Sequence, residues 1–166
     1  FFFLVLCNDG EFLSSVERYD PSTNAWEEEA MALMPTARSY VGTAVLDGKF
    51  YAAGGQDDEA GNAPSNLVER YDFATNAWEE VAPMASARRF HAVAVLDGKL
   101  HAVGGFNGGY SSSVERYDPA TNAWEAVAPM AKARHRHAMA VLDGKLYAVV
   151  WGGYDDGGHL SSVERY

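Results

Sequence analysis

Short apolar runs alternate with turn residues along the whole chain. The run at residues 90–96 is apolar and partly β-branched and ends in Asp97-Gly98, the dipeptide that favours a tight type I′ hairpin. Residues 99–103 form the return strand, 113–117 a third strand with alternating faces, and 124–127 a fourth. No window shows a sustained helical period. The pattern predicts a four-stranded antiparallel sheet.

This pattern is repeated along the chain. Val-Glu-Arg-Tyr begins at residues 16, 68, 114 and 163, at separations of 52, 46 and 49. Asn-Ala-Trp, Leu-Asp-Gly-Lys and Gly-Gly recur in fixed order between these copies. We therefore expect a single all-β domain over 1–166 built from four approximate units: a partial one at 1–34, whole ones at 35–82 and 83–128, and a partial one at 129–166.

The repeat resembles the Kelch motif. Its unit at 83–128 carries Arg88, Leu96-Asp97-Gly98-Lys99-Leu100, Gly104-Gly105, Val114-Glu115-Arg116-Tyr117-Asp118-Pro119 and Trp124, and Ala128-Pro129-Met130 leads to the next Arg134. The resemblance implies a β-propeller of about three and a half four-stranded antiparallel blades, whose first strands line a central channel.

Several positions depart from the repeat. Leu6-Cys7 stands where Gly-Gly is expected, and Val150-Trp151 is interpreted as a two-residue insertion. The apolar segment 1–7 is far shorter than the roughly 20 residues that span a bilayer, so it is interpreted as a buried strand. We expect an incomplete ring, which further blades outside this sequence or another chain would complete.

Composition limits the partners. With 13 Lys and Arg against 23 Asp and Glu, the formal charge is −10, which disfavours nucleic acid. A single cysteine, Cys7, excludes an internal disulfide and favours a reducing, cytoplasmic location. Neither a cofactor nor membrane insertion is expected.

Repeat comparison also separates scaffold from recognition. Residues that recur in every unit, such as the Tyr, the Trp and the lone Arg, are expected to serve the blade. The variable positions lie in the links after each repeated Arg and in the second-to-third loops, at 8–13, 56–66, 106–111 and 154–160. An up-and-down blade places these segments on one face. The candidate partner-binding residues there are Ser39, Tyr40, Gln56, Arg89, Phe90, Phe106, Asn107, Tyr110, His135, Arg136, Tyr154, Asp155 and His159.

The chemistry of these residues suits protein recognition. Arg89, Arg136 and His135 form a basic strip on an acidic chain, beside aromatic contact residues. A peptide that carries carboxylates is the natural partner, although the acidic runs at 57–59 and 155–156 would oppose it. The alternative interpretation is that these charged loop residues are solvated and bind no ligand.

Catalytic and metal sites are not expected. His135 and His137 lie two apart on a predicted strand, so both side chains are expected to face one way. With Asp155 or His159 they have residue types that bind zinc. However, His137 shares its repeat position with His91, which favours packing. Cys7 is flanked by apolar residues and is interpreted as a small buried hydrophobe.

The predicted function is a non-enzymatic module that binds a partner protein or peptide on the variable face. The resemblance also admits a substrate-recognition part of a cullin-based ubiquitin ligase adaptor. A third alternative implied by the resemblance is a Kelch-like enzyme, either an oxidase or a sugar-acid isomerase. A copper oxidase would need a constellation of Tyr, His and Cys, which the sequence does not offer around Cys7.

Overall fold

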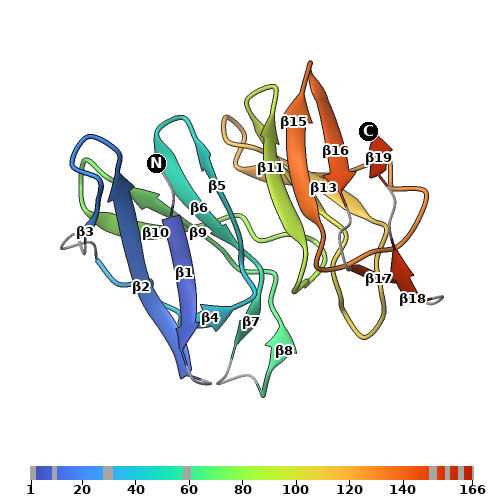
Figure 1. The fold of residues 1–166 in the computed structure, drawn as a ribbon, viewed down its shortest axis with the longest axis horizontal. Helices are drawn as coiled ribbons and strands as arrows, with labels where there is room; N and C mark the ends of the chain where they lie inside the picture. The colour runs from blue at the N-terminus through green and yellow to red at the C-terminus, as the bar shows by residue number, and fades with distance from the viewer. Residues whose placement is uncertain are drawn as a thin grey trace.

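The structure is a computed structural model that describes residues 3–8, 11–27, 32–57, 61–149, 153–155, 158–160 and 163–165. The described residues form strands, turns and loops, arranged as sheets that stand side by side (Figure 1). These are the blades of a partial β-propeller, as the repeat predicted.

Two blades have all four strands. Blade II contains β5 (Gly42–Leu46), β6 (Lys49–Ala53), β9 (Val68–Asp72) and β10 (Ala77–Val81). Blade III contains β11 (Ala92–Leu96), β12 (Lys99–Val103), β13 (Val114–Asp118) and β14 (Ala123–Val127). Each neighbouring pair is antiparallel.

The sheets at the two ends of the chain have three described strands each. Blade I contains β1 (Phe3–Asn8), β2 (Glu11–Asp20) and β3 (Ala25–Glu27), which match the second to fourth strands of a blade. Blade IV contains β15 (Ala138–Leu142), β16 (Lys145–Val149) and β19 (Val163–Arg165), which match the first to third strands.

The Asp-Gly turns have the geometry that the sequence predicts. Asp97 and Gly98 have φ angles of 51° and 68°, and the flanking residues Leu96 and Lys99 are paired across the turn. Positive φ at both central residues defines a type I′ turn, whose twist matches the strands that it joins. This turn therefore sets the register of β11 against β12.

Several strand boundaries differ from the expectation. The strand predicted from Phe90 begins at Ala92, because Phe90 has a φ of 55° and cannot continue an extended strand. The loop predicted over 8–13 is mostly strand, since β2 begins at Glu11. With Leu6-Cys7 in place of the glycine pair, β1 stays paired with β2 to Asn8, with one irregularity between Val5 and Cys7.

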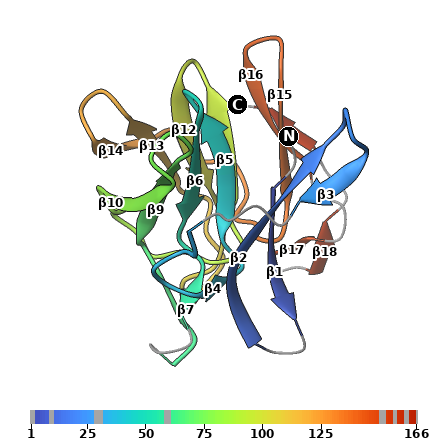
Figure 2. The same cartoon turned by 90° about the vertical axis from the view of Figure 1, so that its left-hand side faces the viewer.

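The first strands of the blades lie next to one another. β5 contacts β11, and β11 contacts β15, whereas β10 and β14 lie at the outside of the molecule (Figure 2). The core fills the space between blades II and III with side chains such as Tyr51, Leu100 and Tyr117, all at most 1% exposed. Burial of such a side chain stabilises the fold by about 1.5–3 kcal/mol.

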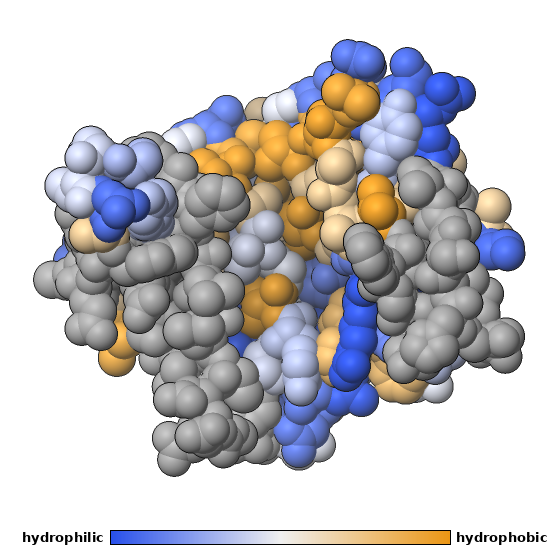
Figure 3. Space-filling model, viewed as in Figure 1, coloured by the Kyte–Doolittle hydropathy of each residue, from blue (hydrophilic) through white to orange (hydrophobic). Residues whose placement is uncertain are grey.

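An apolar surface remains at the tips of the first strands. Apolar atoms gather in the upper middle of the face in Figure 3, where Figure 1 draws the turns of β5, β11 and β15. Val45, Val141 and Leu142 are exposed there, and Leu142 is 59% exposed whereas its counterpart Leu46 is 4% exposed. No described segment is a helix long and apolar enough to cross a membrane.

The opposite end carries the links and the second-to-third loops, and we call it the loop face. In blade II it contains a small sheet of β4 (Arg38–Ser39), β7 (Gln56–Asp57) and β8 (Ala63–Pro64). In blade IV it contains the hairpin of β17 (Gly153–Asp155) and β18 (Gly158–Leu160), at the same end of the molecule in Figure 1.

Candidate functional site

Backbone pairing brings each link against the loop that the sequence predicted to share its face. Ser39 pairs with Gln56 between β4 and β7. In blade III, Arg89 and Phe106 form a bridge with N···O distances of 3.2 and 2.8 Å, and Phe106 also bridges to Tyr110. In each of these two blades, the candidate residues of the link and of the loop therefore lie together.

Three candidate residues share an unusual backbone conformation. Tyr40, Phe90 and Arg136 each stand two residues after a repeated Arg and have φ angles of 55°, 55° and 52°. Side chains disfavour this left-handed region, which is held only where the surrounding structure fixes it. The Arg136 amide donates to the Phe90 carbonyl at 2.7 Å, which ties two of these residues together across blades.

The side chains of the loop face form a continuous row of rings. The Tyr40 and Phe90 rings lie 4.1 Å apart, and the Phe90 and His135 rings 5.9 Å apart. His135 stacks on Tyr110 at 4.6 Å, and Tyr110 meets the edge of Phe106 at 5.9 Å. We call Tyr40, Phe90, His135, Tyr110 and Phe106 the aromatic row.

Two guanidinium groups lie on this row. The Cζ of Arg136 is 4.3 Å from the centre of the Phe90 ring. The Cζ of Arg89 is 5.4 Å from the same ring and 5.2 Å from the Phe106 ring. Cation–π contact of this kind stabilises a guanidinium by about 0.5–1 kcal/mol at an exposed site. Phe90 thus contacts both arginines.

Neutral groups position Arg89. Its Nη1 donates to the Gln56 side-chain oxygen and to the Asn62 carbonyl at 3.1 Å, and the Gln56 amide donates to Asn62 Oδ1 at 2.7 Å. Among the described residues, no carboxylate lies within ion-pair distance of Arg89 or Arg136. Sequence reasoning missed Asn62, although its place after Gly61 in the loop was a turn signal.

The accessibility of the candidates differs. Tyr40, Asn107 and Arg136 are exposed, whereas Arg89, Phe90, Phe106 and Tyr110 are partly buried. Ser39, Gln56 and His135 are buried, so they support the surface from below. Tyr154 pairs with His159 through the backbone of β17 and β18, next to Asp155, but their side chains lie outside the described part of the structure.

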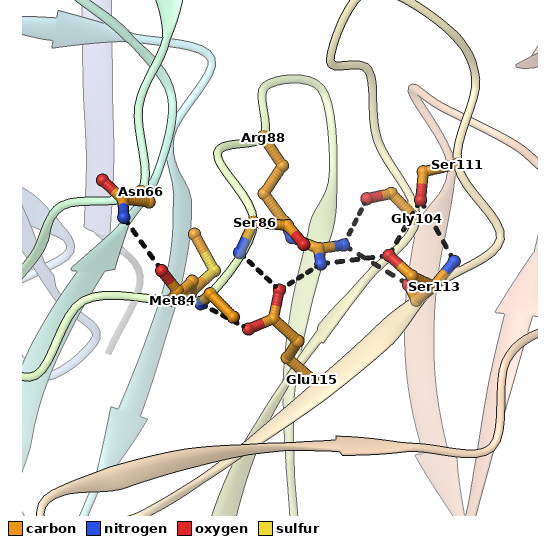
Figure 4. Close-up of polar contacts among 9 residues, drawn as sticks. Asn66, Met84, Ser86, Arg88, Gly104, Ser111, Ser113 and Glu115 are labelled. Carbon is orange, nitrogen blue, oxygen red and sulfur yellow. Dashed lines mark hydrogen bonds and ion pairs between the residues drawn. The ribbon is translucent and has the colours of Figure 1, made fainter.

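The repeated arginines lie beneath this surface and are structural. Arg88 Nη2 binds Glu115 at 2.5 Å, and its Nη1 donates to the Gly104 carbonyl at 2.7 Å (Figure 4). Arg38 binds Glu69 at 2.6 Å in the same way. Both arginines are at most 2% exposed. Each pair fastens a link to the third strand of its blade, as their repetition predicted.

The prediction that the side chains of His135 and His137 face one way is wrong. Arg136 has a positive φ, so the chain between His135 and His137 is not an extended strand. His135 joins the aromatic row, while the His137 ring lies against Gly104 and the His91 ring against Gly54. Burial, followed by the nearby arginines, lowers the pKa of His91 to about 3 and that of His137 to about 4. The described residues contain no group of three or more metal-binding side chains.

The comparisons with known proteins agree with the fold. A family described as the KLHDC2/KLHL20/DRC7 Kelch-repeats domain matches residues 7–153. The chain belongs to the Kelch-repeat family. The framework of its Kelch blades thus consists of the Asp-Gly turns, the glycine pairs and the ion pairs of Arg38 and Arg88.

Named relatives share part of this Kelch domain. An F-box/kelch-repeat protein of Arabidopsis thaliana is 41% identical over 70 residues, which is 42% of this chain and 14% of the relative. Kelch-like protein 7 of Mus musculus is 38% identical over 74 residues (45% and 12%), and Kelch-like protein 4 of Homo sapiens 40% over 68 residues (41% and 9%). The matched segments thus cover at most about one seventh of these relatives.

Proposed function

We propose that this Kelch chain is a non-enzymatic interaction module that binds an acidic segment of a partner protein on its loop face. Membership of the Kelch-repeat family supports a protein-interaction module. The observation that carries the finer proposal is the pair of guanidiniums of Arg89 and Arg136, both held against Phe90.

The electrostatics favour a carboxylate. The chain carries a formal charge of −10, yet these two cations face no carboxylate among the described residues. Charge-assisted hydrogen bonds from guanidinium to carboxylate are among the strong ones, and Arg forms them with two parallel bonds. Tyr40 supplies exposed aromatic area next to the pair, as interfaces commonly do.

The test is a double substitution. Acidic peptides selected from an immobilised peptide array are expected to bind Arg89→Ala/Arg136→Ala at least about tenfold more weakly than the wild type, because loss of a hydrogen bond to a charged group costs about 1.5–3 kcal/mol. The affinity is measured by isothermal titration calorimetry.

A matched control comes from the outer strands. Arg70 and Arg116 form exposed pairs with Glu79 and Glu125 at 2.5 Å. Arg70→Ala/Arg116→Ala removes the same charge elsewhere and is expected to leave the affinity near that of the wild type. Equal weakening in both double variants would show a general charge effect and would contradict the assignment of this face.

The names of the relatives favour one specific form of this function. F-box/kelch-repeat and Kelch-like proteins are among them, and a substrate-recognition role in a cullin-based ubiquitin ligase would use the same loop face. A cytoplasmic location and completion of the ring by further blades or a second chain belong to the same proposal.

A further inference from the structure

A polar cavity opens beside the aromatic row in blade III. Its volume is about 250 Å³, and Phe106 and Tyr110 form part of both its wall and the row. The rest of its lining is polar or small and includes Ser86, Arg88, Asn107, Gly109, Ser111 and Ser113. A segment bound to Arg89 and Arg136 would pass next to this cavity, since Arg89 and Phe106 are paired through the backbone.

The charge of the cavity is already balanced. Arg88 binds Glu115 and donates to Ser113 Oγ at 3.1 Å (Figure 4). Glu115 accepts two further hydrogen bonds, from the amides of Ala85 at 2.7 Å and Ser86 at 3.1 Å. A carboxylate entering the cavity would meet no unpaired cation there and would lie near the Glu115 carboxylate. The site therefore favours a neutral group.

The cavity retains hydrogen-bond donors. The hydroxyls of Ser111 and Ser113 lie 2.8 Å apart, and only one of their two protons is used between them. Their oxygens accept from the Ser113 amide at 3.1 Å and from Arg88 Nη2. Whichever serine donates to the other, one hydroxyl proton remains to donate to a ligand. Arg88 Nε also has no acceptor among the described residues.

The cavity has residues that the preceding blade lacks. Leu67 occupies the position of Ser113, and Pro64 that of Tyr110. The turn is otherwise equivalent, because Ser65 Oγ accepts from the Leu67 amide at 3.1 Å as Ser111 Oγ does from Ser113. The hydroxyls of Ser113 and Tyr110 are therefore additions to a shared blade framework.

We propose that this cavity binds the carboxamide of a Gln or Asn side chain from the partner segment, next to the acidic residue at Arg89 and Arg136. The one hydroxyl proton that the serine pair leaves free donates to the amide oxygen, and Tyr110 and Asn107 are available to the amide NH₂. The source of the ligand rests on the proposed function, but the preference of the cavity for a neutral amide over a carboxylate does not.

The test uses two small probes on the free protein. N-acetylglutamine amide and N-acetylglutamate amide are titrated separately while backbone amide resonances are followed by NMR. The glutamine probe is expected to give a saturable shift of the Ser111 and Ser113 resonances, and the glutamate probe a much smaller one. Absence of a glutamine shift, or an equal shift with glutamate, would overturn the proposal.

Variants of the cavity test whether the glutamine-induced shift arises there. Ser113→Leu introduces the side chain of Leu67 and is expected to abolish the glutamine-induced shift at Ser111, whereas the reciprocal control Leu67→Ser is expected to retain it. If Ser113→Leu does not fold, Gly109→Leu fills the same cavity from a position where an added Cβ meets nothing within 4 Å. A glutamine shift that persists in the folded cavity variant also overturns the proposal.

The same titrations separate this inference from the proposed function. Shifts at Arg89 and Arg136 with the glutamate probe report the acidic site, whereas shifts at Ser111 and Ser113 with the glutamine probe report the cavity. A negative result at the acidic site therefore does not decide the result at the cavity, and the reverse also holds.

Discussion

At the residue scale, one position of the repeat holds a buried histidine in two blades. His91 and His137 occupy one repeat position, and each packs against a glycine of the preceding blade beside a buried arginine. Val41 occupies the same position in blade II, so the site accepts an apolar side chain. The histidines thus carry a titratable group in a site that requires only packing.

Acid should therefore weaken the fold through these histidines. The neutral form is favoured in the folded state, where the pKa of His91 is about 3, while the unfolded chain takes up the proton near pH 6.5. The unfolded state binds more protons between these values, so stability falls as the pH drops below about 6.5. The slope is at most about 1.4 kcal/mol per pH unit for each histidine.

We expect His91→Val to flatten this dependence. Urea unfolding between pH 7 and pH 5, where carboxylates contribute equally in both proteins, is expected to show a smaller loss of stability in the variant. Parallel pH dependences for wild type and His91→Val would contradict a buried neutral His91.

Within elements, glycine determines how strands end and where blades approach. Gly104 follows β12 with a φ of 62°, and a Cβ there would lie 2.5 Å from the Arg134 carbonyl of the next link. Gly54 stands in the same relation to Arg88, at 2.6 Å. Both of these glycine pairs therefore end the second strand of their blade and allow the following backbone to approach closely.

Gly104→Ala should destabilise the protein by more than the conformational cost alone. Gly108→Ala is the control, because Gly108 has a φ of 72° but open space around its Cβ position. The control is expected to cost about 1–2 kcal/mol from the left-handed conformation, and Gly104→Ala clearly more because backbone must move. The free energies of unfolding in urea give the comparison, and equal values would argue against a steric role.

Sequence predicted the elements better than the geometry of the site. Period-two strands, Asp-Gly turns and glycine pairs gave the blades, because these depend on local chemistry that the chain repeats, the Asp-Gly turn and the glycine pair three times each. The start of β11 was wrong, since the left-handed Phe90 has no glycine to signal it. Asn62 and the cavity at Ser113 were missed because they depend on contacts between segments distant in sequence.

At the scale of the whole molecule, hydrogen bonds from recurrent side chains join one blade to the next. We call the Trp and Asn side chains that bind one link residue a clasp. Trp124 Nε1 donates to the Ala82 carbonyl at 2.8 Å, and the Ala82 amide donates to Asn122 Oδ1 at 2.9 Å. Trp78 and Asn76 hold Ala32 with the same distances. These recurrent residues hold the outer ends of neighbouring blades together while the apolar core fills the space between them.

Loss of one clasp should loosen a blade junction. Asn122→Ala removes the acceptor of both the Ala82 amide and the Tyr117 hydroxyl, and is expected to cost about 1–3 kcal/mol. Faster hydrogen exchange at the Ala82 amide would locate the effect.

Asn24→Ala is the matched control for this clasp. Asn24 has a φ of 53° and accepts from the Tyr19 hydroxyl at 2.7 Å, but it holds no other blade within the described residues. It should cost less than Asn122→Ala. Unchanged exchange at Ala82 in Asn122→Ala would contradict the clasp.

Under the proposed function, the left-handed residues at positions 40, 90 and 136 imply a trade between stability and recognition. The backbone there would suit glycine, so each larger side chain is kept at a conformational cost of about 1–2 kcal/mol. Glycine at these positions would relieve this conformational cost but would also remove the ring and cation–π contacts that the three side chains make. For an engineer, the same three positions are those where a new binding specificity can be introduced without redesigning the blades.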